Sequence, residues 1–192
     1  FRANHGLALP TSPTQIHFRA PDQGPLDFHP IDMTERTIEI RELPAFRAAF
    51  LRHVGPYEQV GPTWERLCAQ AGPLGLFGPD TKMFGASYDD PEVTPADKLR
   101  YDACIVVAKD FDATRAEGSE LGVAEFGGGR YAVTIHEGPY ENLAQTYGEL
   151  FGLAFGKGEH KPGTSACLEF YLNDPSSTAP ADLRTEIWTP LA

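Results

Sequence analysis

The stretch Arg52-His53-Val54-Gly55-Pro56-Tyr57-Glu58 occurs a second time, slightly altered, as Ile135-His136-Glu137-Gly138-Pro139-Tyr140-Glu141. The separation is 83 positions (140 − 57), and the same shift relates Trp64 to Tyr147. Internal similarity at a fixed offset indicates a duplicated structural unit. Because there are only two copies, a closed pair of pseudo-symmetric units is a better interpretation than a stacked repeat array.

Both units show the same order of predicted elements. Alternating apolar side chains predict two strands, a Gly-Pro corner starts a helix, and two more strands follow. The strands are expected near residues 37–41, 46–54, 83–88 and 101–108, and again near 123–126, 131–135, 166–172 and 186–191. The sequence therefore predicts an α+β fold of two β-β-α-β-β modules, with antiparallel sheet and one main helix per module.

Composition narrows the class of protein. The chain has 192 residues, of which 41% are hydrophobic, so it can bury a sizeable core. A net charge of −11 argues against direct binding to nucleic acid. No apolar run approaches the roughly 20 residues of a membrane span, so no membrane association is expected. The odd number of cysteines (Cys68, Cys104 and Cys167) is typical of a reduced, cytoplasmic protein.

Sites for metals and cofactors are not predicted. The twin histidines His53 and His136 have no third ligand at metal spacing, so we interpret both as structural. Neither a Ser-His-Asp nor a Cys-His arrangement with recognisable spacing is present. We therefore expect no metal and no cofactor.

The first 36 residues lie outside the repeat. Residues 1–19, with Gly6 and the pair Ser12-Pro13, resemble the end of an AraC-type helix-turn-helix DNA-binding domain. The insertion Ala8-Leu9-Pro10-Thr11 departs from the usual tight spacing, and an ordinary polar tail is the alternative. Residues 20–34 are predicted to be a linker, because proline and glycine are frequent there. The chain begins with Phe1, which suggests a fragment or a processed protein.

The rest of the chain, residues 35–192, resembles the GyrI-like small-molecule-binding domain. The resemblance rests on the paired Gly-Pro-Tyr-Glu motifs, the turns Asp90-Pro91 and Asp174-Pro175, and the closing segment Arg184-Thr185-Glu186-Ile187-Trp188-Thr189-Pro190-Leu191. It implies two modules, at residues 35–110 and 119–192, around a pseudo-twofold axis with a central groove that holds the ligand. It also implies a pocket of aromatic side chains around an acidic residue, which often takes apolar cations.

Strand parity suggests which residues line that pocket. Glu169 and Tyr171 alternate onto one face of their strand, and Glu186 and Trp188 share a face of theirs. We expect the two faces to coincide, so that two carboxylates and two aromatics meet. Glu169 stands in an apolar strand, where a buried carboxylate needs a partner or a function. A solvent-facing Glu169 is the alternative, and the resemblance favours the pocket.

Comparison of the two repeats indicates which of the two acidic candidates is more specific to the ligand. Glu186 matches Asp102, which suggests a role in the fold, whereas Glu169 falls opposite Gly85 and has no acidic twin. Glu169 is therefore the preferred ligand-binding residue. Four further aromatic residues are candidates for packing at the helix start or for lining the groove: Tyr57, Tyr140, Trp64 and Tyr147.

Three functions are compatible with these features. The first is the effector-binding part of an AraC-type regulator, which binds a small, apolar or cationic aromatic molecule and meets DNA only through an N-terminal domain. The second is a hydrolase of cyclopropane-containing toxic compounds, with Glu169 as general acid or base, as in some stand-alone members. The third is a gyrase-binding inhibitor. A homodimer is compatible with each.

Overall fold

The computed structural model describes residues 37–192. The predicted AraC-type remnant at residues 1–19 and the linker at 20–34 lie outside this range. The strands are β1 (Glu39–Leu43), β2 (Phe46–Val54), β3 (Met83–Ser87), β4 (Arg100–Val106), β5 (Gly122–Phe126), β6 (Gly129–Glu137), β7 (Cys167–Tyr171) and β8 (Arg184–Pro190), and the helices are α1 (Gly61–Ala71) and α2 (Leu143–Phe155). Neither helix of this described part is long and apolar enough to cross a membrane.

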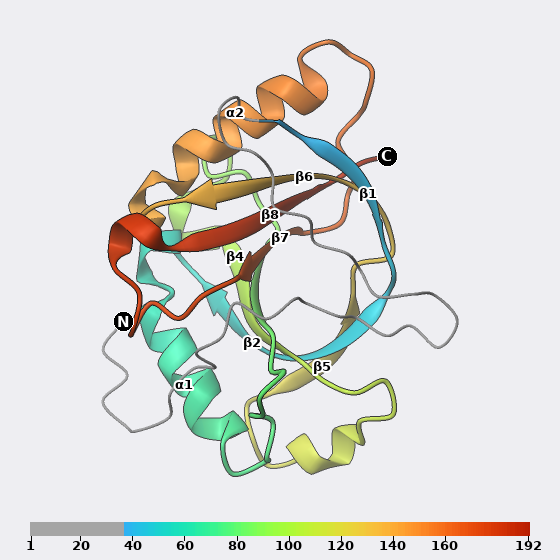
Figure 1. Ribbon diagram of the computed structural model, residues 1–192. Helices are drawn as coiled ribbons and strands as arrows, with labels where there is room; N and C mark the ends of the chain where they lie inside the picture. Colours follow the sequence, from blue (N-terminus) through green and yellow to red (C-terminus); the bar gives the residue numbers. More distant parts are fainter. Residues whose placement is uncertain (1–36) are drawn as a thin grey trace.

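All strands belong to one antiparallel sheet with the order β1-β6-β8-β7-β3-β4-β2-β5. The sheet is strongly curled, and both helices lie on its outer side (Figure 1). Helix α1 packs mainly on β2 and β4, and α2 packs on β6. The predicted α+β fold, with two β-β-α-β-β modules and one main helix in each, is confirmed.

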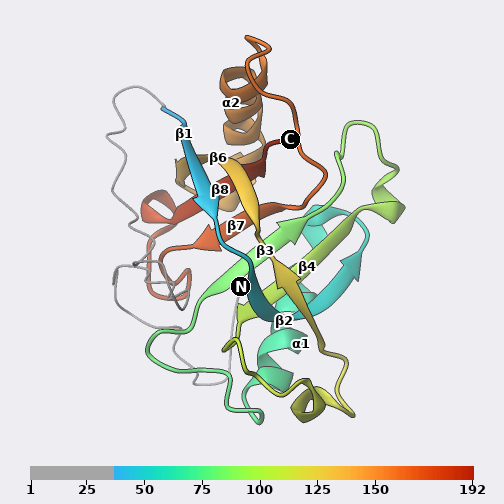
Figure 2. The same cartoon turned by 90° about the vertical axis from the view of Figure 1, so that its right-hand side faces the viewer.

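The modules exchange their first strands, a feature that the repeat did not predict. Strand β1 pairs with β6 of the second module, and β5 pairs with β2 of the first. Only Pro44 and Ala45 separate β1 from β2, so the chain runs as a single bent path from the β1 edge of the sheet to the strand next to the opposite edge. Figure 2 shows this path meeting the equivalent β5–β6 path. At the meeting point the amide of Gly128 donates a hydrogen bond to the carbonyl of Leu43 (2.9 Å).

The sheet has a hydrophobic core on each side. Inside the curl, the aromatic rings of Phe84, Phe126 and Phe170 pack together, and Phe84 stacks on Phe170 with 5.1 Å between centroids. On the outer side, Leu67 of α1 and Leu150 of α2 are fully buried against the sheet. Burying each such side chain stabilises the fold by about 1.5–3 kcal/mol. Because both faces are covered, a polar side chain in a central strand is buried whichever way it points.

The helices begin later than the Gly-Pro corners suggest. Pro56 has an extended ψ of 136°, and a single 3₁₀ turn, Tyr57–Gln59, precedes α1. Pro62 rather than Pro56 occupies the first turn of α1, where a missing N–H group is harmless. The second module repeats this geometry, with a turn at Tyr140–Asn142 before α2. The twin tyrosines therefore lie in the short turn between strand and helix.

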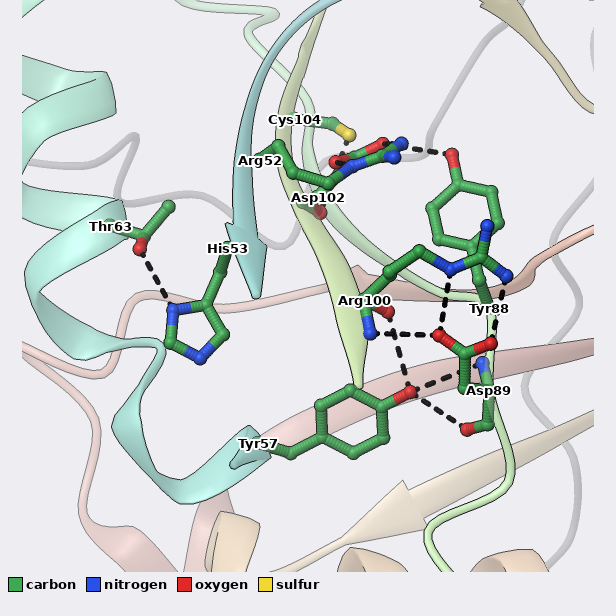
Figure 3. Close-up of polar contacts among 9 residues, drawn as sticks. All are labelled: Arg52, His53, Tyr57, Thr63, Tyr88, Asp89, Arg100, Asp102 and Cys104. Carbon is green, nitrogen blue, oxygen red and sulfur yellow. Dashed lines mark hydrogen bonds and ion pairs between the residues drawn. The ribbon is translucent and has the colours of Figure 1, made fainter. Parts of the chain in front are cut away.

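The twin histidines hold these corners together. Nε2 of His136 donates to the carbonyl of Pro139 (3.1 Å), because a carbonyl can only accept. In the neutral ring Nδ1 then accepts the hydroxyl proton of Thr146 in α2 (2.8 Å). In the first module, His53 makes the equivalent contact to Thr63 (3.4 Å), which Figure 3 shows. Each histidine thus links the corner carbonyl to the helix of its own module.

Candidate functional site

The described residues include four buried acidic side chains, each at most 8% exposed: Asp102, Glu169, Asp174 and Glu186. Two of them are paired with arginine. Asp102 accepts two hydrogen bonds from Arg52 (2.5 and 2.7 Å), and Glu186 accepts one from Arg41 (2.8 Å). Within residues 37–192 no arginine or lysine forms an ion pair with Glu169 or Asp174. A buried charge without a counter-charge is costly, so these two acidic residues require an explanation.

Glu169 in β7 receives hydrogen bonds from two tyrosines. The hydroxyl of Tyr147 in α2 donates to Oε1 (2.8 Å), and that of Tyr171 in β7 donates to Oε2 (3.2 Å). Burial raises the pKa of Glu169 above its usual range, and the two tyrosines partly offset that rise. The side chain is thus a desolvated carboxyl group held in place by phenol groups.

A chain of donors extends from Glu169 to the first module. The hydroxyl groups of Tyr171 and Tyr101 lie 2.8 Å apart, and Nε1 of Trp64 in α1 donates to the Tyr101 hydroxyl (3.2 Å). Because the indole N–H can only donate and Tyr171 donates to Glu169, Tyr101 donates to Tyr171. The rings of Trp64 and Tyr140 both meet Tyr171 edge to face, at 5.5 and 5.6 Å. Side chains from both modules therefore surround one carboxylate.

Gly85 in β3 makes room for this cluster. It pairs directly with Glu169 across the β3–β7 junction, where the two modules join. A Cβ atom at Gly85 would lie 2.1 Å from the hydroxyl oxygen of Tyr101. The residue equivalent to Glu169 in the first module is thus a glycine, and the Tyr101 ring fills the space that a side chain there would take. The asymmetry seen in the sequence has a steric basis in the structure.

Glu186 and Trp188 do not join this site, which corrects the prediction that they share a face with Glu169 and Tyr171. Glu169 pairs with Ile187, and Trp188 pairs with Leu168. Paired residues point to the same side of a sheet, so Trp188 and Glu186 lie inside the curl, opposite the helices. There Nε1 of Trp188 donates to Glu186 (3.0 Å). Alternation along a strand predicts which of its own residues share a face. Only the register between strands determines which residues of two neighbouring strands lie on the same face.

The other predicted aromatic residues lie on the helix side. Trp64, Tyr147 and Tyr140 reach the Glu169 cluster. Tyr57 packs against Tyr101 at 6.1 Å but directs its hydroxyl to the backbone of Asp89, as Figure 3 shows.

The sequence reasoning did not identify Tyr101 or Asp174. The sequence could have indicated Tyr101, since a tyrosine within a buried strand needs a partner for its hydroxyl group. The sequence could not have indicated Asp174, because the same turn occurs in the first module at Asp90.

This arrangement is suited to a positively charged, aromatic or apolar ligand. It offers a carboxylate, several ring faces and hydroxyl groups within a few ångströms of one another. Among residues 37–192 no cluster of three or more histidine, cysteine, aspartate or glutamate side chains could hold a metal ion.

Comparison with known proteins places the chain in a family. The profile of the GyrI-like small molecule binding domain matches residues 36–192. DNA gyrase inhibitor 2 of Dickeya dadantii (strain 3937) is 32% identical over 155 residues, which cover 79% of this chain and 93% of that protein. YgiV of Escherichia coli (strain K12), described as a probable transcriptional regulator, is 25% identical over 163 residues, covering 83% of this chain and 100% of that protein.

A solved structure shows the same fold. SAV2435, whose structure was determined bound to tetraphenylphosphonium, has a TM-score of 0.58 and 16% identity, covering 81% of this chain and 94% of that chain. The family profile, which spans every described strand and both helices, shows that this chain belongs to the family of GyrI-like small-molecule-binding domains.

Proposed function

We propose that this chain is the ligand-sensing domain of a transcription regulator and that it binds a small apolar cation or aromatic molecule against Glu169. The observation that carries the proposal is the Glu169 carboxyl group, which is buried among aromatic rings and has no basic partner in the described part of the chain. A ligand cation would supply the missing counter-charge. Each ring face beneath such a cation would add about 0.5–2 kcal/mol. The name of YgiV and the ligand of SAV2435 support this assignment.

Calorimetric titration with two probes of similar shape tests the proposal. Tetraphenylphosphonium carries a charge but cannot donate a hydrogen bond, and triphenylphosphine oxide is neutral. Replacing Glu169→Gln keeps the volume and an acceptor oxygen but removes the charge. We expect the variant to bind the cation at least about tenfold more weakly and the neutral probe about as well as before.

Glu186→Gln is the matched control, because it removes a buried carboxylate from the opposite face of the same sheet. Cation binding should survive this change. The proposal is wrong if the Glu169 variant binds both probes like the unchanged protein, or if both variants lose affinity equally.

We further propose that the regulator is of the AraC type, on the resemblance of residues 1–19. Ligand binding would then bias an attached DNA-binding domain, which requires that the ligand bind two conformations with different affinity. A mobility-shift assay with this chain alone should give no sequence-specific complex. A tight, specific complex would show that this chain binds DNA without a further domain and would contradict the assignment.

Hydrolysis of a cyclopropane-containing compound is a second candidate. The raised pKa of Glu169, caused mainly by burial, would suit a general acid or base, and Tyr147 and Tyr171 are placed to orient it. Product formation that disappears in Glu169→Gln while neutral-ligand binding persists would favour catalysis over sensing.

Inhibition of gyrase is a third candidate, supported by the name of the Dickeya relative. A pull-down of purified gyrase with the immobilised chain tests it directly. Recovery of gyrase at the level of uncoated beads would eliminate this function.

A further inference from the structure

Asp174 is the second buried acidic residue without a basic partner, and it lies in the turn that follows β7. Its side chain is only 4% exposed. Oδ1 accepts a hydrogen bond from the amide of Ser176 (2.7 Å), whereas Oδ2 is buried and accepts none. One carboxylate oxygen thus holds the turn, and the other is desolvated without compensation.

The first module shows that the turn does not require this burial. Asp90, the twin of Asp174, holds the same kind of turn by accepting a hydrogen bond from the amide of Glu92 (2.8 Å). Asp90 is exposed to solvent, so its second oxygen is free to bind water. Burial of the Asp174 carboxylate is therefore a feature of the second module alone.

The twin tyrosines differ in the same way. The hydroxyl of Tyr57 is engaged by the turn of its own module, where it donates to the carbonyl of Asp89 (2.7 Å) and accepts from the Asp89 amide (3.3 Å) (Figure 3). Tyr140 makes no equivalent hydrogen bond within the described residues. Its ring instead meets Tyr171, which donates to Glu169. In the second module, within residues 37–192, a phenol and a carboxylate oxygen thus lack the hydrogen bonds that their twins make or can make to water.

These two groups lie close to each other and to Glu169. Both adjoin Tyr171: the Tyr140 ring meets the Tyr171 ring at 5.6 Å, and Asp174 follows Tyr171, the last residue of β7, by three positions. Burial, followed by the negative charges of Glu169 and Asp174, raises the pKa of Tyr140 to about 12. The Tyr140 hydroxyl is thus within electrostatic reach of both carboxylates that lack a basic partner.

We infer that Asp174 and Tyr140 form a second polar subsite beside Glu169, which takes a positively charged hydrogen-bond donor such as an amidinium or ammonium group. The preferred ligand then carries two cationic centres joined by an apolar body. One centre pairs with Glu169, and the other donates to Oδ2 of Asp174. This inference rests on the proposed function, since it assumes that the Glu169 site binds a ligand. Hydrogen bonds between charged partners are the strong ones, so the second centre should add measurable affinity.

Titration with mono- and bis-amidines tests the subsite. Benzamidine supplies one cationic centre, and a series of bis-benzamidines with alkyl linkers of increasing length supplies two at varied separation. We expect at least one bis-benzamidine to bind more tightly than benzamidine. Asp174→Asn, which keeps the acceptor for Ser176, should weaken that compound about tenfold and change benzamidine binding by less than about twofold.

Asp90→Asn is the matched control, because it removes the same charge from the exposed twin turn and should alter neither affinity. Tyr140→Phe provides a second variant that keeps the ring, and it should weaken only the bis-benzamidine.

The outcomes separate this inference from the proposed function. If Glu169→Gln weakens both compounds while Asp174→Asn and Tyr140→Phe weaken neither, the ligand site stands and the second subsite does not. If neither amidine binds and Glu169→Gln leaves tetraphenylphosphonium binding unchanged, both proposals are wrong. A loss of benzamidine and bis-benzamidine alike in Asp174→Asn would assign Asp174 to the fold and overturn the subsite.

Discussion

At the scale of single residues, the proposed ligand site lies where the two halves of the domain differ. Glu169 and Gly85 are equivalent in the repeat and pair directly across the β3–β7 junction. A carboxylate at both positions would place like charges side by side in a buried sheet, which is unfavourable. One acidic residue and one glycine instead leave space for the Tyr101 hydroxyl, which links Trp64 to Tyr171 and so to Glu169 in the chain of donors.

The steric role of Gly85 can be tested directly. Gly85→Ala would place a Cβ atom 2.1 Å from the Tyr101 oxygen, and the buried ring has little freedom to move. We expect a loss of about 1–3 kcal/mol in the free energy of unfolding, together with weaker cation binding because the chain of donors is displaced. Denaturant unfolding and calorimetric titration measure the two effects.

Gly148→Ala is the control, since no atom lies within 4 Å of the Cβ that it would add on α2. Alanine there should raise stability slightly, as expected for a glycine in a helix. Equal stability of the Gly85 variant and the unchanged protein would show that the ring moves freely.

At the scale of elements, the corner between strand and helix explains why the heptapeptide is repeated. The histidine bridges the corner carbonyl and a threonine hydroxyl of the following helix, Thr63 in one module and Thr146 in the other. These threonines are themselves 83 positions apart (146 − 63), so the repeat includes the partner of the histidine as well as the motif.

Removing the threonine hydroxyl should affect the two corners unequally. Thr146→Val leaves Nδ1 of the buried His136 without a donor, and we expect a loss of about 1–2 kcal/mol in unfolding free energy. Thr63→Val should have a smaller effect, because the Thr63–His53 contact is longer, at 3.4 Å against 2.8 Å. Denaturant unfolding of both variants gives the comparison, and a larger loss at Thr63 would contradict it.

The crossing of the two bent strand paths depends on glycine. Gly127 has a φ of +74°, and an added Cβ atom would lie 2.8 Å from the carbonyl oxygen of Pro44. Both the backbone conformation and the overlap disfavour a side chain, so Gly127→Ala should lower the unfolding free energy by about 2–4 kcal/mol. Thermal and denaturant unfolding measure this loss.

Gly75→Ala separates the two causes. Gly75 also has a positive φ of +65°, but no atom lies within 4 Å of its added Cβ. It should therefore show only the conformational cost, about 1–2 kcal/mol. If both variants lose the same stability, the close approach to Pro44 is unimportant.

At the scale of the whole molecule, acidic side chains are buried on both faces of one curled sheet. Inside the curl Glu186 faces Arg41, Trp188 and, through Arg41, Glu39. Burial raises the pKa of Glu186 from its ordinary 4.5 to about 7, although Arg41 opposes the rise. On the outer face, burial raises the pKa of Glu169 as well. Burial therefore raises the pKa of one interior carboxyl group on each face of the sheet.

This burial predicts how stability depends on pH. Between about pH 4.5 and 7 the native Glu186 binds more protons than the unfolded chain does, so stability falls as pH rises through this window. The contribution is complete below the unfolded pKa and is lost above the folded one. Glu186→Gln should show a smaller decrease in unfolding free energy across the same window, measured in denaturant. Identical pH profiles would show that Glu186 is ionised throughout.

The amino-acid sequence by itself determined the modular plan. Residue spacing and alternation were enough to predict the duplication and the order of elements, because both patterns reflect local geometry along the chain. They also showed that Glu169 has no acidic twin in the first module. Helix starts were placed too early because a Gly-Pro corner does not reveal that Pro56 is extended and that a 3₁₀ turn intervenes.

Only the tertiary structure decided which residues meet. The exchange of β1 and β5 between modules depends on contacts between segments far apart in sequence. The same is true of the register that puts Glu186 on the other face of the sheet from Glu169, and of the burial of Asp174 but not Asp90. A shift of one residue in register moves a side chain to the other face of a sheet, and nothing within a single strand specifies that shift. The sequence singled out the Glu169 carboxylate, and the packing of two modules determined what surrounds it.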